Sequence, residues 1–225
     1  MAYATVADLR TYMDFPSGDT ASDVDLQRAL DAGAAWIDWG TGRTFSLTPT
    51  STVAKISAAV SATIVPLVDL HSTSPTVAVD TAGDRTFSTT LLPEQYALNP
   101  FAGPPFQELE AWAVPAGGIA PVVFTPGELV RVTGQWGYVD PVTGAAPAAV
   151  EQANLLLGAR WFKRREVPFN VLQQPELDAF QVVPTQDADV LALLMPLALP
   201  GSPIAAAAAA RDLAPATAGT RWVLV

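Results

Sequence analysis

The residue types that usually carry catalysis are scarce in this sequence. It has one histidine, His71, and no cysteine, which excludes disulfides, zinc–thiolate sites and thiolate nucleophiles. Glu108 and Glu110 have the spacing of one strand face, and Asp187 and Asp189 lie near the expected start of a helix, so either pair could serve as acid and base. Such pairs need a shaped, desolvating pocket, and we interpret both as solvated charge. The sequence predicts no enzyme, no cofactor and no metal site.

Basic residues gather in one place, at Arg160, Lys163, Arg164 and Arg165. One interpretation is a helix C-terminus, where cations are favoured by the helix dipole. The other is an ion-pairing surface for the acidic N-terminal region of a neighbouring copy. DNA binding is disfavoured because 12 basic residues face 22 acidic ones, a net charge of −10, and phosphate contacts need a basic surface.

Large aromatic residues fall into two expected groups. Trp136, Trp161 and Phe162 are expected in the core, because aromatic side chains bury large apolar areas. Trp36 and Trp39 flank the apolar stripe of a helix, and at least one of them is expected at a subunit interface, where tryptophan is enriched.

Hydrophobic periodicity indicates the elements that must position these residues. Apolar residues at helical spacing predict helices over about 5–13, 22–40, 147–166 and 186–195, with capping boxes beginning at Thr5 and Ser22. Between them the period becomes alternating, and prolines favour short strands. The predicted fold class is α+β: a small helical bundle made by the N- and C-terminal helices, an inserted β-rich domain and an extended C-terminal arm. The predicted segments are N-terminal helices 1–47, β-rich domain 48–138, C-terminal helices 139–196 and arm 197–225.

The arm combines prolines with an alanine run, so it is expected to be poorly ordered in a free monomer. It nevertheless carries Trp222, Val223, Leu224 and Val225. We expect this apolar segment to bind a neighbouring subunit or another partner. The alternative is that it folds back as an edge strand on its own β-domain.

No signal peptide and no apolar run of about 18–20 residues is evident, so we expect a protein made in the cytoplasm without a membrane segment.

Several motifs together resemble the head–tail connector (adaptor) proteins of long-tailed bacteriophages, a head-completion family. The resemblance covers about residues 3–196, and the motifs that carry it lie at 3–9, 26–32, 42–45, 96–100, 132–138 (VTGQWGY), 159–165 (ARWFKRR) and 189–196. The order and spacing of these motifs carry the resemblance, since each is weak alone. The arm at 197–225 lies outside it.

The resemblance implies a structural role in the virion, at the head–tail interface or neck. Such adaptors form a homo-oligomeric ring, usually dodecameric, below the portal protein. The ring extends the DNA channel, lets phage DNA pass without specific binding and presents a platform for stopper or tail-terminator proteins. An acidic lumen suits such a conduit because it repels phosphates. Two alternatives stay open: another neck or tail-completion ring protein, or a carbohydrate-binding or hydrolytic β-domain with helical flanks.

Overall fold

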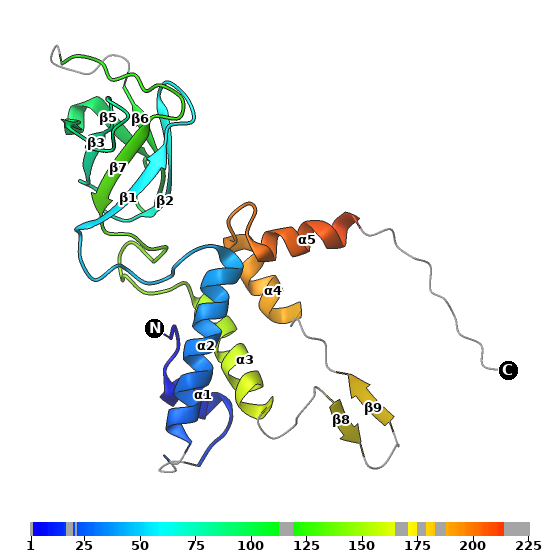
Figure 1. Ribbon diagram of the computed structural model, residues 1–225. Coiled ribbons are helices and arrows are strands. Elements are labelled where there is room, and N and C mark those ends of the chain that lie inside the picture. The colour runs from blue at the N-terminus through cyan, green and yellow to red at the C-terminus, as the bar shows by residue number, and fades with distance from the viewer. Residues whose placement is uncertain are drawn as a thin grey trace. The chain divides into compact units, whose positions relative to one another are not determined.

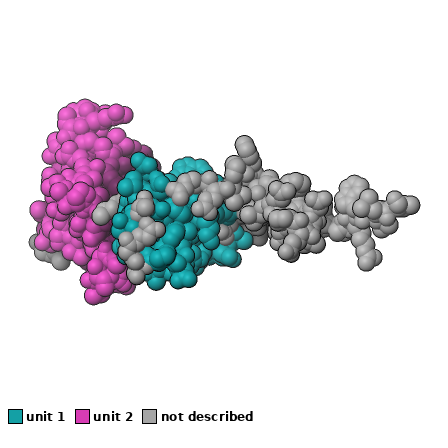
Figure 2. Space-filling view, turned by 90° about the horizontal axis from the view of Figure 1, so that it is seen from below, with its two compact units in different colours: residues 1–42, 148–225 teal, residues 43–147 magenta. Residues whose placement is uncertain are grey.

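The protein divides into two compact units, described here from a computed structural model. Unit 1 comprises residues 1–42 and 148–225, and unit 2 comprises 43–147 (Figure 2). The structure describes residues 2–16, 20, 22–112, 119–164, 171–174, 179–182 and 188–213. The described residues form helices together with antiparallel sheets, which confirms the predicted α+β class.

The helices of unit 1 begin and end largely where local chemistry favours it. α1 (Val6–Tyr12) starts at a complete capping box, in which the Thr5 hydroxyl accepts from the Asp8 N–H and the Asp8 carboxylate accepts from the Thr5 N–H. α2 (Asp23–Thr41) ends at Gly42, whose φ of 72° is the left-handed conformation that glycine adopts without a Cβ penalty. The capping box expected at Ser22 is wrong, since Ser22 makes no side-chain cap bond.

α2 packs antiparallel against α3 (Ala148–Arg164), and the two lie side by side in Figure 1. Glycines allow the close approach: a Cβ on Gly33 would lie 2.8 Å from Asn154 Nδ2, and one on Gly158 would lie 2.9 Å from Leu30. The seam buries Leu26, Leu30 and Ile37 of α2, and it buries Val150, Ala153, Leu157 and Phe162 of α3. These are the periodic apolar positions of the sequence, so burial follows the helical pattern.

α4 (Ala188–Leu194), the 3-10 turn η4 (Met195–Leu197) and α5 (Pro203–Leu213) complete the described part of unit 1. α5 corrects the expectation of a poorly ordered arm from residue 197. Pro203 occupies the first helical position, where a missing N–H costs little, and alanine is the best helix former. Ile204 is buried and lies 2.9 Å from where a Cβ on Gly40 would be, so the helix also has an apolar anchor on α2.

The strands β8 (Val171–Gln174) and β9 (Ala179–Val182) pair as an antiparallel two-stranded sheet, within the segment 139–196 for which the sequence predicted helices.

Unit 2 consists of two antiparallel sheets around one core. A four-stranded sheet has the order β1-β7-β3-β4, and a three-stranded sheet has the order β2-β6-β5. The strands are β1 (Val53–Ala58), β2 (Ile64–Leu70), β3 (Thr76–Val79), β4 (Thr89–Thr90), β5 (Tyr96–Asn99), β6 (Phe106–Ala111) and β7 (Leu129–Gly134). The 3-10 turn η1 (Pro93–Gln95) precedes β5.

The central strand β7 alternates as its sequence predicts. Val130 and Val132 are buried, while Arg131 and Thr133 point to the other face and pair with Ala78 and Thr76 of β3. The side chains of both sheets meet in one apolar cluster that includes Val65, Leu67, Leu70, Val77, Leu109, Phe124 and Trp136.

Candidate functional site

The described carboxylates that could have served as acid and base lie on two elements, β6 and α4. Glu108 is exposed on β6, and Glu110 accepts a hydrogen bond from Asn99 Nδ2 at 3.1 Å. Asp189 is exposed at the start of α4, and Asp187 lies outside the described residues. No group of three or more potential metal-ligating side chains occurs in the described part of the chain.

His71 lies in unit 2, after β2. It lines a surface hollow of about 510 Å³ together with Ser72, Thr73, Ser74, Pro104 and Pro141. Its Nδ1 atom is buried without a hydrogen-bond partner among the described residues. The described residues that line this hollow include hydroxyls but no carboxylate, so His71 has no acid beside it there.

The basic cluster lies at the C-terminal end of α3. Arg160 is half-buried, Lys163 and Arg164 are exposed, and Arg165 lies outside the described residues. Within the described part of the chain, Lys163 and Arg164 form no ion pair. The helix dipole favours Lys163 and Arg164 in the last turn of α3, so these cations are stable without a partner and can still attract one.

The same end of unit 1 carries the acidic start of α2. Phe162 of α3 packs edge-on against Phe15 at 5.8 Å between ring centroids and shares a buried cluster with Leu26, so the α3 terminus lies beside the start of α2. Asp23 and Asp25 lie in the first turn of α2 and Asp8 in that of α1. The Thr5 hydroxyl and N–H lower the pKa of Asp8, so it stays charged. One end of the helical unit therefore presents both signs of charge.

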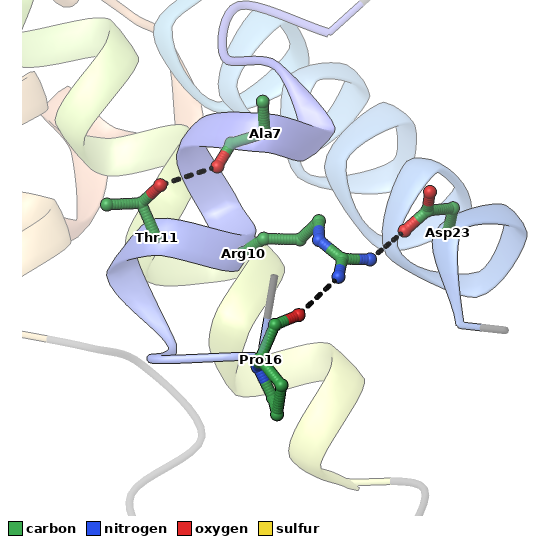
Figure 3. Close-up of polar contacts among 5 residues, drawn as sticks. All are labelled: Ala7, Arg10, Thr11, Pro16 and Asp23. Carbon is green, nitrogen blue, oxygen red and sulfur yellow. Dashed lines mark hydrogen bonds and ion pairs between the residues drawn. The ribbon is translucent and has the colours of Figure 1, made fainter. Parts of the chain in front are cut away.

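Part of this charge is used inside the protomer. Arg10 Nη1 contacts Asp23 Oδ1 at 2.6 Å and Arg10 Nη2 donates to the Pro16 carbonyl at 2.9 Å, while Thr11 donates to the Ala7 carbonyl within α1 (Figure 3). The Arg10–Asp23 ion pair therefore joins α1 to the start of α2.

Asn154 is a polar junction that periodicity did not single out. It is fully buried on α3, and its Oδ1 accepts from the backbone N–H groups of Tyr3 and Ala4 at 3.0 Å each. Its Nδ2 donates to the Leu30 carbonyl at 2.9 Å. One side chain thus ties the N-terminal segment, α2 and α3 together. The available signal was a polar residue on the apolar stripe between Ala153 and Leu157.

Two motifs that carry the family resemblance meet in unit 2. Arg43 donates to Asp69, stacks on the Tyr138 ring at 4.6 Å, and shares Asp69 with Gln107 Nε2 at 2.7 Å. The Tyr138 N–H donates to the Thr44 carbonyl at 2.8 Å. The segments 43–45 and 134–138 are therefore held together by these contacts, and we name the pair of segments the clamp. Its contacts stabilise the fold of unit 2.

Trp136 and Gly137 complete the clamp. Trp136 is buried, as predicted, and its indole N–H donates to the Val53 carbonyl at 2.8 Å. Lys55 lies over its ring at 4.4 Å, and burial lowers the pKa of Lys55 while the charge of Asp69 opposes that shift. Gly137 has φ 149°, and a Cβ there would lie 2.4 Å from the Ser46 carbonyl oxygen. No other residue type fits this position without a backbone shift.

The structure confirms one of the two remaining core predictions for aromatic residues and contradicts the other. Phe162 is buried as expected, but Trp161 is half-buried, so the prediction that Trp161 is a full core residue is wrong. The helix turns Phe162 toward Leu9 and Leu26 instead. Trp39 is 64% exposed on α2, and Trp36 is half-buried. Trp222, Val223, Leu224 and Val225 lie outside the described residues.

The sequence matches no protein-family profile and no curated protein. Its fold is similar to that of a chain from the neck of an empty gene transfer agent particle computed with C6 symmetry, at 20% identity, over 89% of this chain and 94% of that chain, with a TM-score of 0.50. A chain from the virion of a native gene transfer agent particle is also similar, at 20% identity over 88% and 90% of the two chains, with a TM-score of 0.48. The first likeness establishes a shared fold along nearly the whole of both chains.

No described helix has both the length and the apolar character needed to span a membrane.

Proposed function

We propose that this protein is a structural component of the neck of a tailed-phage-like particle, where it acts as the head–tail adaptor. The observation that carries the proposal is the shared fold with a neck chain of a gene transfer agent particle, which extends over 89% of this chain and 94% of the other. The adaptor-like sequence motifs also support it, because the motifs at 42–45 and 132–138 contact each other in the clamp of unit 2.

In this role the protein forms a homo-oligomeric ring, dodecameric as in the adaptors it resembles. The ring binds the portal protein on one side and a stopper or tail-terminator protein on the other. Phage DNA passes through the lumen without specific binding, as suits a chain with net charge −10. The protein is made in the host cytoplasm, needs no cofactor and catalyses no reaction.

The basic end of α3 is the proposed contact between neighbouring copies. Lys163 and Arg164 are exposed, and acids at the starts of α1 and α2 offer opposite charge. A ring needs two different patches on each copy, and these patches meet that need. Each exposed pair is worth about 0–1 kcal/mol, but a ring repeats it at every interface. Arg160 and Arg165 belong to the same proposed surface.

Mixing the purified chain with portal protein and imaging the product by negative stain tests the role. We expect a ring attached to portal. Rings that bind a tail protein but never portal would favour the stopper or tail-terminator alternative, and a monomer that hydrolyses or binds carbohydrate would overturn the proposal.

The contact is tested by the double reversal Lys163→Glu/Arg164→Glu across a salt series. We expect its rings to dissociate at lower salt than wild-type rings. Arg85→Glu is the control, because Arg85 is an exposed cation of unit 2 that belongs to neither proposed patch. Unchanged assembly of the double reversal at every salt concentration would refute the contact.

Removal of residues 214–225 tests the segment at Trp222–Val225. We propose that this segment binds a neighbouring copy or the portal in the assembled neck. Its removal should weaken attachment and leave the melting temperature nearly unchanged, since α5 stays intact. A truncated protein that attaches normally would contradict this part of the proposal.

A further inference from the structure

The outer side of the last turns of α2 is an apolar surface. Ala32, Ala35, Trp36 and Trp39 follow the spacing i, i+3, i+4 and i+7 and so share one side of the helix, which we name the α2 apolar face. The alanines are exposed, Trp36 is half-buried and Trp39 is 64% exposed. An exposed tryptophan on an apolar helix face is typical of a binding surface.

Two acids border the face. Asp31 is exposed and directly precedes Ala32, whereas Asp38 is half-buried and accepts a hydrogen bond from the Tyr3 hydroxyl. The face therefore selects an apolar partner, and the chain itself carries one in Trp222–Val225, an apolar segment that follows α5.

The anchoring of α5 brings this segment within reach. The Leu199 N–H donates to the Thr41 carbonyl at 2.8 Å, and Ile204 packs at Gly40. The start of α5 is thus held at the C-terminal end of α2, the end of the helix that carries Trp39. From Ile204 to Leu213 the helix extends about 14 Å at a rise of 1.5 Å per residue, and neighbouring helices lie about 8–10 Å apart. The eight residues 214–221 span up to about 26–29 Å, so the tether can return to the face whichever way α5 points.

We infer that the segment Trp222–Val225 binds the α2 apolar face of its own chain in the free protein. A short tether gives an effective concentration on the order of millimolar, which exceeds that of a second copy in dilute solution. The inference goes beyond the proposed function because it assigns the segment a site before assembly. Ring formation does not depend on it, so the two can fail separately.

Val24 provides a matched control on the same helix. It is also 64% exposed, but it lies 15 residues before Trp39, about 22 Å along the axis and away from the start of α5. A segment without a defined site would also reach this more distant position less often, so Val24 measures the effect of reach. Binding at the face is distinguished from reach by the loss of the preference when Trp39 is replaced by serine.

Double-cysteine variants test the inference cleanly, because the chain has no cysteine of its own. In full-length protein at low micromolar concentration, Ala35→Cys with Leu224→Cys should form an intrachain disulfide at least ~10-fold faster than Val24→Cys with Leu224→Cys, a difference worth about 1.4 kcal/mol. The rate should not change with protein concentration. Adding Trp39→Ser should slow closure, and adding Val24→Ser should not.

Equal rates for the two pairs would overturn the inference. So would crosslinks that form between chains at a rate rising with concentration, since these would place a second copy on the face. Both alternatives are read from the same gel, because an intrachain disulfide changes mobility without doubling the mass.

Discussion

Asn154 gives the sharpest test of how unit 1 holds together. Asn154→Leu keeps the branching and size of the side chain, so it opens no cavity. It removes the bonds to Tyr3 N–H, Ala4 N–H and the Leu30 carbonyl. Each bond contributes about 1 kcal/mol net. The buried Ala4 N–H left without a partner costs about 2 kcal/mol more, and burial of leucine offsets a similar amount. We expect a net loss of about 3 kcal/mol.

Hydrogen exchange is the suitable assay, because the two units can open separately and one melting curve would mix them. In Asn154→Leu, amides of α2 and α3 should lose protection while those of β7 keep it. Asn99→Leu is the control, since the Asn99 side chain donates one hydrogen bond, to Glu110 in unit 2, and its loss should cost about 1 kcal/mol or less. Wild-type protection of α2 and α3 in Asn154→Leu would refute the role of Asn154 as the junction of unit 1.

Three further outcomes follow from the geometry. Gly137→Ala should cost about 2–4 kcal/mol, measured by denaturant unfolding, because its Cβ would collide with a backbone carbonyl at a positive φ. Phe162→Ala should cost about 3–5 kcal/mol as a core truncation, and Trp161→Ala clearly less, because Trp161 is half-buried. Burial raises the pKa of the Asp38 carboxyl above its ordinary value, so the folded state binds that proton more tightly than the unfolded state does. The protein should therefore gain stability as pH falls through the folded-state pKa. Asp38→Asn should lack this gain, while the amide oxygen still accepts from the Tyr3 hydroxyl.

A specific result would contradict each of these three predictions. Gly83→Ala, at φ 72° with open space around it, is the control for the glycine, and an equal loss in both would show that conformation rather than collision sets the cost. Equal losses for the two aromatic truncations would mean that Trp161 carries as much of the core as Phe162. A pH profile of Asp38→Asn that matches wild type would show that another group governs acid stability.

The class of fold could be predicted from the sequence because its signals are local. The capping box at Thr5 and Asp8, the helical stripe from Leu26 to Ile37 and the alternation of Val130 and Val132 depend on neighbours within a few residues. Such patterns fix element type through backbone hydrogen bonding and period, before any distant contact forms.

Other features depended on contacts between distant residues. Local signals favour a helix at the alanine run, but only the packed structure shows that Ile204 of this helix contacts α2 at Gly40. It also shows that Phe162 of α3, rather than Trp161, packs with Leu9 in the core. Composition does not show which face of a helix packs against another helix, so the contacts of Ile204 and Phe162 could be identified only in the tertiary structure.

The polar junctions show the same limit most clearly. Asn154 bonds residues more than 120 positions away, and Asp69 receives Arg43 and Gln107 from different segments. In the sequence each is one polar residue among many. A buried polar group is stable only when its partners arrive with the right geometry, and only the tertiary structure brings those partners together.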